Sequence, residues 1–232
     1  MEYLKKTITL PVSGLEAVIR EADSHAEDLL FRKGLERIHF ALPGYWAYLT
    51  VRMGDKEPVT EADILNLVLP DQHFLAIEIY RLTYGDILRL SGAAGRGGNA
   101  GYEYDLTNLD LVPLPEGACG PDPEFTFTLP RTGHVVDYGY LTGKQEIEEL
   151  NLDDFSLGRL EFRAIRRVDG APAKLADVQS WPMIDHIALR KDMESKRCGL
   201  DTRVRFTDDR GVAVVRDLLL DPSFLAPGLR SG

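Results

Sequence analysis

The sequence predicts an α+β protein of two related halves, each with β-hairpins flanking a helical segment. The main observation is a repeat: TITLPVSG at residues 7–14 recurs about half a chain length later as TFTLPRTG at residues 126–133. Both copies alternate Thr with apolar residues and then turn through Leu-Pro and Gly, which is typical of a β-hairpin. Apolar residues at helical spacing occupy the middle of each half, which predicts the helices between the hairpins.

Length and composition agree with a folded protein of this kind. The 232 residues are 44% hydrophobic and 28% charged, which is ordinary for globular proteins. We predict a first half over residues 1–117 and a second half over residues 124–232. The linker between them, residues 118–123, belongs to a Pro- and Gly-rich loop that can continue neither a helix nor a strand. Each half is long enough to bury a core of its own.

The net charge disfavours several classes of partner, and the cysteine content indicates the compartment. The formal net charge of −10 disfavours general binding to nucleic acids and to anionic membranes. We expect no membrane insertion, because no apolar run reaches the roughly 18 residues that a spanning helix needs. Cys119 and Cys198 lie far apart in sequence, which fits a reducing compartment. We therefore expect a cytoplasmic protein, unless an assembly carries it out of the cell.

The first elements of each half are predicted by comparing the two copies. Residues 15–20 have helical spacing when taken alone, but the second copy continues as a returning strand after Gly133, so we predict a strand in both places. Ser24 and Thr142 then begin capping-box patterns, which predict the next helix of each half. The alternative to a true duplication is that β-hairpins with Pro/Gly turns look alike by chance.

Further helices follow from start and stop signals. Thr60 begins a capping pattern for a helix to about Val68, and Pro70 suits the first turn of a helix that continues to Tyr84. We expect Asp169-Gly170 and Gly199 to end two of the later helices. Helices are also predicted over residues 38–51, 155–168 and 183–198, and closing hairpins over residues 86–92 with 102–106 and 201–208 with 212–218.

Side chains capable of chemistry are scattered along the chain. His25 and Asp28 have the spacing of metal ligands on a helix, but a charged helix face explains them as well. Asp185 and His186 are neighbours that point in diverging directions. The glycine-rich stretch at residues 92–101 continues as a strand, whereas a phosphate-binding loop must open a helix. The sequence therefore predicts no catalytic residue, no cofactor and no metal site.

The sequence does not decide whether two apolar segments belong to the core or to an interface. Tyr45, Trp46 and Tyr48 form an aromatic cluster that suits either the core or an interface. The C-terminal segment LLLDPSFLAPGL, residues 218–229, either packs on its own half or docks a partner.

Several segments together resemble one protein family. The chain from about residue 69 onward is similar to the baseplate hub assembly proteins of T-even-like phages and related contractile tails. Many of those relatives look to carry Cys-x-x-Cys pairs at the two closing hairpins, which would suit a zinc site. Here the tips read SGAAGRGGNAG and TDDRGV, so no zinc site is carried over. The segments that carry the resemblance are LPDQ (69–72), IEIYRLTYGD (77–86), YDLTNLDLVPLPEG (104–117), PDPEFTFTLPRTG (121–133), YLTGKQE (140–146) and LLLDPSFLAPG (218–228).

The resemblance implies a non-enzymatic, chaperone-like assembly protein or a structural protein of a contractile phage-tail-like baseplate hub. Its partners would be hub or spike proteins, while its oligomeric state is left open. Two alternatives remain at this stage: an enzyme acting on a small molecule or a cell-wall polymer, and a cytoplasmic adaptor outside any phage system. The candidate partner contacts lie at the closing hairpin tips: Arg96, Asn99, Asp208, Asp209 and Arg210.

Overall fold

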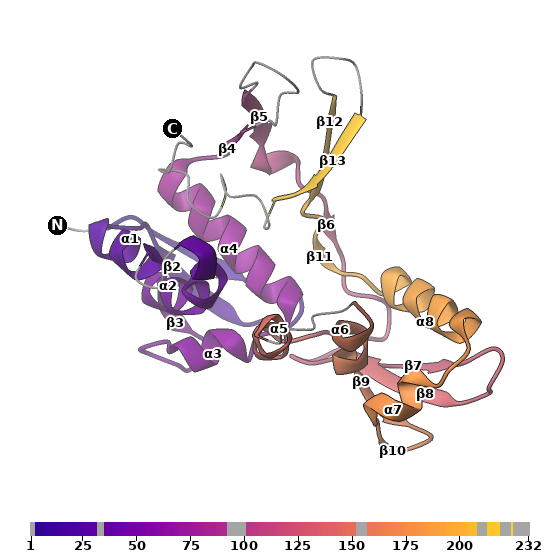
Figure 1. Ribbon diagram of the computed structural model, residues 1–232. Coiled ribbons are helices and arrows are strands. Elements are labelled where there is room, and N and C mark those ends of the chain that lie inside the picture. The colour runs from indigo at the N-terminus through magenta and orange to yellow at the C-terminus, as the bar shows by residue number, and fades with distance from the viewer. Residues whose placement is uncertain are drawn as a thin grey trace.

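The computed structural model describes residues 3–31, 35–91, 101–151, 157–207, 213–218 and residue 224. The fold is α+β, with antiparallel strands in several small sheets among the helices. Figure 1 shows the first sheet on the left, the second sheet at the lower right and the long helix α4 (Leu69–Tyr84) between them. The two regions predicted as halves therefore lie side by side.

The first half builds a small antiparallel sheet and packs helices against it. The hairpin turns at Gly14, whose φ of +69° lies in the left-handed region that glycine adopts without a steric penalty. The sheet has the order β1-β2-β3. Its elements are β1 (Lys5–Thr9), β2 (Glu16–Arg20), α1 (Ser24–Phe31), the 3₁₀ helix η1 (Leu35–Phe40), α2 (Leu42–Leu49), β3 (Thr50–Met53), α3 (Glu61–Leu65) and α4.

The second half follows a similar order of strands and helices, without a counterpart of η1 and with the additional strand β10. Its first hairpin turns at Gly133, where φ is +76°. The sheet has the order β10-β9-β8-β7, so one short strand extends it beyond the arrangement of the first half. The elements are β7 (Glu124–Thr128), β8 (Val135–Gly139), α5 (Gly143–Leu150), α6 (Leu157–Ala164), β9 (Ile165–Val168), β10 (Ala171–Pro172), α7 (Leu175–Gln179) and α8 (Met183–Ser195).

Strand pairing is also the same in the two sheets. Between β2 and β3, Ala17 pairs with Met53, and the register shifts after Val18. Between β8 and β9, Val136 pairs with Val168, and the register shifts after Asp137. The predicted duplication stays a prediction, and this shared pairing, irregularity included, is the feature that favours it.

A closing hairpin follows the long helix of each half, and a short seam joins the two hairpins. In the seam, Gly199 pairs with Val112, and the N–H of Asp201 donates to the carbonyl of Asp110 at 2.9 Å. Both hairpins project toward the same side of the molecule in Figure 1. The elements are β4 (Ile87–Ser91), β5 (Gly101–Asp105), the 3₁₀ helix η2 (Leu106–Asn108), β6 (Leu111–Val112), β11 (Gly199–Leu200), β12 (Arg203–Thr207) and β13 (Ala213–Asp217).

The first hydrophobic core crosses the boundary between the halves, whereas the buried residues of the second all belong to the second half. The first core contains Tyr45 and Trp46, which places most of the aromatic cluster inside the protein. It also takes in Leu218 and Phe224 from the C-terminal segment. These two residues therefore pack on the first half, and the rest of the segment lies outside the described residues. The second core is smaller and consists of Phe125, Leu129, Val136, Tyr138, Ile165, Val178, Trp181 and Leu189.

Two predicted helices were too long, because each runs directly into a third strand. The helix predicted over residues 38–51 is divided into η1, α2 and β3. The helix predicted over residues 155–168 gives α6 and β9, with residues 155–156 outside the described part. In both places β-branched residues follow the helix and pair with the second strand of the hairpin, and this pairing overrides the helical spacing.

Several predicted boundaries also change. The capping boxes at Thr60 and Thr142 are confirmed, but the helix after Thr60 ends at Leu65 rather than Val68. At the start of α1 the cap is Asp23, whose carboxylate accepts the Ala26 N–H at 2.9 Å, and not Ser24.

Two glycine signals have other roles than the predicted helix ends. Asp169-Gly170 forms the turn between β9 and β10, with φ of +51° and +77°. Gly199 opens β11, because α8 has already ended at Ser195.

Candidate partner-binding surface

The closing hairpins are rooted on one seam, so their bases lie together. The β6–β11 pairing fixes the base of β12–β13 beside the segment that follows β4–β5. The predicted partner contacts at the tips lie outside the described residues, so the structure does not place them: Arg96, Asn99, Asp208, Asp209 and Arg210.

A cleft of about 340 Å³ opens at the base of the hairpins. Its walls come from β1, from one face of α4 and from the segment around η2 and β11. Six of the eleven lining residues are apolar, and Lys6, Glu78 and Arg81 add charged groups. Apolar surface combined with placed polar groups is typical of binding sites. The lining residues are Lys6, Ile8, Thr9, Phe74, Ile77, Glu78, Arg81, Leu106, Thr107, Leu109 and Leu200.

Ion pairs join the strand to the helix along one edge of this cleft. The buried carboxylate of Glu78 pairs with the ammonium of Lys6 and, at 2.6 Å, with the guanidinium of Arg81. Arg81 also donates to Asp86 at 2.6 Å. Partial burial works to lower the pKa of Arg81, but the bonds to Asp86 and Glu78 outweigh it and the pKa is raised. These charges stabilise one another and hold β1 against α4.

The outer edge of β1 lies beside the same cleft. The backbone groups of Leu4 and Leu10 point toward β2. The Leu10 N–H donates to the Leu15 carbonyl at 2.9 Å, and the Leu4 carbonyl accepts the Glu21 N–H at 3.1 Å. Because bonded pairs alternate along an antiparallel ladder, the N–H and C=O groups of Thr7 and Thr9 point away from β2. Among the described strands, none pairs with this edge of β1. The edge can therefore accept an added strand.

No protein-family model, curated protein or solved structure matches this sequence. Within the described residues, no helix is long and apolar enough to cross a membrane.

The reactive side chains considered from the sequence lie in separate places. His25 packs edge-on against the Tyr48 ring, 5.1 Å between centroids. Asp185 bonds to the turn of the second hairpin, whereas His186 lies 3.6 Å from Glu161. In the part of the chain that the structure describes, no three His, Cys, Asp or Glu side chains gather where they could hold a metal ion.

The two cysteines are free thiols in different surroundings. Cys119 is exposed in the linker. Cys198 is buried between the halves, where burial raises the pKa of its thiol even though the hydroxyl of Tyr140 acts in the opposite direction.

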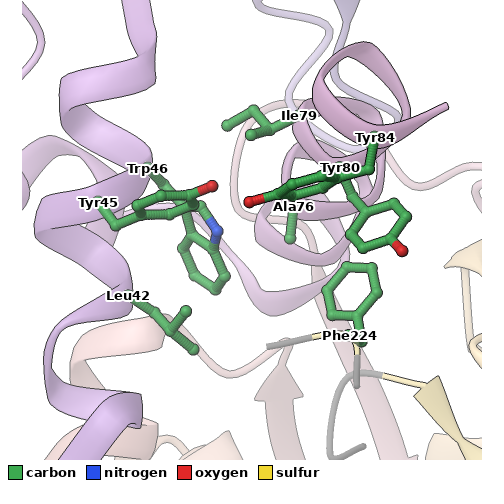
Figure 2. A pocket seen from close by; sticks show the side chains of 8 residues that line it. All are labelled: Leu42, Tyr45, Trp46, Ala76, Ile79, Tyr80, Tyr84 and Phe224. Carbon is green, nitrogen blue, oxygen red and sulfur yellow. The ribbon is translucent and has the colours of Figure 1, made fainter. Parts of the chain in front are cut away.

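A second hollow is filled by aromatic packing. Figure 2 shows Tyr45 and Trp46 of α2 facing Tyr80 and Tyr84 of α4, with Phe224 closing the space from below. Phe224 stacks on Tyr80 with 4.9 Å between ring centroids. The free space is about 20 Å³, room for roughly one water molecule. The packing of Phe224 in this hollow attaches that residue to the first half, and the remaining space is too small for a ligand.

Burial also changes the acidity of two side chains of α4. Burial raises the pKa of Tyr80 to about 12 and lowers the pKa of His73 to about 4, so the His73 imidazole is neutral at physiological pH. The carboxylate of Asp217 acts in the opposite direction on His73 but does not outweigh burial.

Sequence reasoning missed the cleft because its walls come from segments more than a hundred residues apart. The only local signals were the shared strand face of Lys6 and Ile8 in β1 and the mixed face of α4 that carries Phe74 and Glu78. Neither signal shows by itself that a groove remains open between them.

Proposed function

We propose that this chain is a non-enzymatic assembly or structural protein of a contractile phage-tail-like baseplate hub, acting in the cytoplasm of the producing cell. Its partners would be hub or spike proteins. The context comes from the sequence resemblance described above. The observation that carries the binding role is the partly apolar cleft beside the outer edge of β1, with which no described strand pairs.

The cleft suits an extended segment of a partner protein. Main-chain groups of such a segment would bond to the outward N–H and C=O groups of Thr7 and Thr9, adding a strand to the sheet. Alternate side chains of the added strand would then enter the cleft, where Ile77 and Leu109 provide apolar contacts. Main-chain bonds supply affinity in this arrangement, and the side-chain pocket selects the sequence.

The closing hairpins provide the second part of the proposed surface. Their bases lie beside the cleft, and the residues proposed to contact a partner at the tips are Arg96, Asn99 and Arg210. Basic and acidic residues are both present in these tips, and charge at the rim of an interface mainly governs orientation and rate of association.

The binding role is tested by co-expressing the chain with baseplate hub and spike proteins of contractile tails and measuring co-purification. Thr7→Pro removes an outward N–H and leaves the β1–β2 ladder intact, so the fold is expected to survive. The variant should lose partner binding by at least tenfold. Thr126→Pro is the matched control, because Thr126 holds the same place in the edge strand β7 of the second half.

Three results would count against the proposal. Undiminished binding by folded Thr7→Pro would exclude strand addition at β1. Absence of binding to every hub and spike protein would remove the baseplate role. Turnover of a small molecule or of cell-wall polymer by the purified chain would favour the enzyme alternative.

A further inference from the structure

The starts of α4 and α8 occupy the same place in the two halves, but only one of them is covered. At the start of α4, the N–H of Leu69 donates to the carbonyl of Leu141 at 2.7 Å. Pro70 packs so closely on Gly199 that a Cβ there would lie 2.9 Å from the Cβ of Pro70. The second half therefore covers the first turn of α4.

The first turns of α8 are open instead. Met183 is 67% exposed, Ile184 56% and Ile187 45%, and these residues stand in the helix positions of Leu69, Pro70 and His73. Ile187 lies one turn from Met183 and Ile184, so the three side chains share one face of the helix. Lys191 lies one turn further along, and Arg131 is held beside this helix by its N–H bond to Asp185, 2.8 Å. We call these five residues the α8 face: Met183, Ile184, Ile187, Lys191 and Arg131.

The surface around Gly199 in the second half, which covers the start of α4, has an exposed counterpart around Gly85 in the first half. Gly85 corresponds to Gly199, with φ of +89° against +86°, but nothing lies within 4 Å of a Cβ built at Gly85. Leu4 is 62% exposed, Tyr84 49% and Ile87 46%.

These residues lie together, because the Glu21 N–H bonds to the Leu4 carbonyl and the Ala22 N–H to the Thr83 hydroxyl, each at 3.1 Å. We call this surface the Tyr84 face, and its members are Leu4, Tyr84, Gly85 and Ile87, with Glu21 and Asp86 at its border.

We propose that copies of this chain associate head to tail, with the α8 face of one copy packed on the Tyr84 face of the next. The contact would repeat, between molecules, the packing of the α4 start on the second half within one molecule. Charge supports it, because Arg131 and Lys191 belong to one face and Glu21 borders the other, where Asp86 is already paired with Arg81. Opposite charges across an interface favour the correct register and faster association.

The geometry makes this contact heterologous. In Figure 1, α8 lies at the far side of the second half from the first sheet and from the end of α4 that carries the Tyr84 face. Two different faces at opposite ends of a molecule produce a ring where the rotation closes and an open chain where it does not.

The intermolecular contact would differ from the internal one at one point. Inside the molecule, the Gln72 amide fills the space that a side chain on Gly143 would need. Ser24 stands in place of Gly143 in the first half, and His186 stands in place of Gln72 in the second. The apolar side chains around Ile184 and Ile87 therefore form the centre of the proposed contact.

Sedimentation velocity of the purified full chain over about a hundredfold range of concentration tests the proposal. The mass should rise with concentration toward multiples of the monomer. Ile184→Glu, which blocks the α8 face, and Ile87→Lys, which blocks the Tyr84 face, should each leave the chain monomeric. Mixed in equal amounts, the two variants should form a 1:1 dimer, because each keeps the face that the other lacks. Val215→Glu, an exposed residue on β13, is the matched control and should associate as the wild type does.

Three results would overturn the proposal: a wild type that stays monomeric throughout, a loss of association in only one of the two variants, or a mixture that does not dimerise. Thermal unfolding monitors the fold of each variant, and Leu4→Lys replaces Ile87→Lys if the latter does not fold. The assay uses this chain alone, so its failure would leave the proposed hub role unaffected.

Discussion

Asp71 and Asp185 make the same contact in the two halves: each buried carboxylate accepts two consecutive backbone N–H groups of the Leu-Pro hairpin turn. The side chains come from the first turns of α4 and α8, so each long helix is fastened to the hairpin of its own half. Both residues are fully buried. The four bonds are Val12 N–H to Asp71 at 2.8 Å, Ser13 N–H to Asp71 at 3.0 Å, Arg131 N–H to Asp185 at 2.8 Å and Thr132 N–H to Asp185 at 3.1 Å.

We predict that Asp185→Ala lowers the free energy of unfolding by about 2–4 kcal/mol, because two backbone donors lose a charged acceptor. Asp185→Asn keeps one acceptor oxygen and should cost less than the alanine variant. Urea denaturation followed by circular dichroism gives both values. Equal stability of the alanine variant and the wild type would show that the contact is not what holds α8 to the turn.

Stability should fall as the pH drops from about 7 toward 4, in part because of His73. Its pKa is about 4 in the folded chain, while an unfolded histidine has about 6.5, so the unfolded state binds more protons within this window. The group favours folding above pH 6.5, and that contribution is lost as the pH approaches 4. The largest loss is about 3 kcal/mol for a shift of this size.

His73→Leu removes this titration and serves as the comparison. The difference in unfolding free energy between wild type and variant should change across pH 4–6.5 and stay constant above pH 7. A difference that does not depend on pH would mean that His73 is solvated in the folded chain.

Gly199→Ala and Gly85→Ala form a matched pair. Both residues have φ near +90°, so alanine is strained at both places by about 1 kcal/mol. Only at Gly199 does the added methyl also meet Pro70, so Gly199→Ala should destabilise by at least about 1 kcal/mol more. Thermal unfolding of the two variants measures this difference, and equal losses would mean that the seam does not pack as described.

Phe224→Ala should release the C-terminal segment from the first half. Phe224 is 6% exposed and stacks on Tyr80, and truncating such a buried ring costs about 3 kcal/mol. The expected result is faster cleavage of the C-terminus by a protease than in the wild type. Leu111→Ala is the control, since Leu111 is 55% exposed, and it should leave the cleavage rate unchanged.

The hairpins were predictable because their turns have local chemistry and occur twice. Taken alone, the run from Leu15 to Arg20 reads as a helix, and only its counterpart after Gly133 indicated the strand. The strands β3 and β9 were missed because each follows a helix without a turn residue. Their residues, such as Thr50 and Ile165, are strand formers, but strand pairing with β2 and β8 depends on the tertiary fold.

The candidate surfaces were beyond sequence reasoning for a different reason. Lys6 and Leu200 line one cleft, and Tyr45 and Phe224 line one hollow, arrangements that only the packing of the halves creates. The exposure of Ile184 had no local signal either, because the equivalent position in α4 is covered. Helical spacing identifies an apolar face, but it does not identify what covers that face.

The most direct measurement is deletion of this gene in a cell that produces the tail particle, followed by electron microscopy of the lysate. Complete contractile tails should disappear, and hub and spike proteins should be left unassembled. Complementation with the wild type or with Thr126→Pro should restore the particles, and Thr7→Pro should not. Normal numbers of complete, contractile particles in the deletion strain would contradict the account.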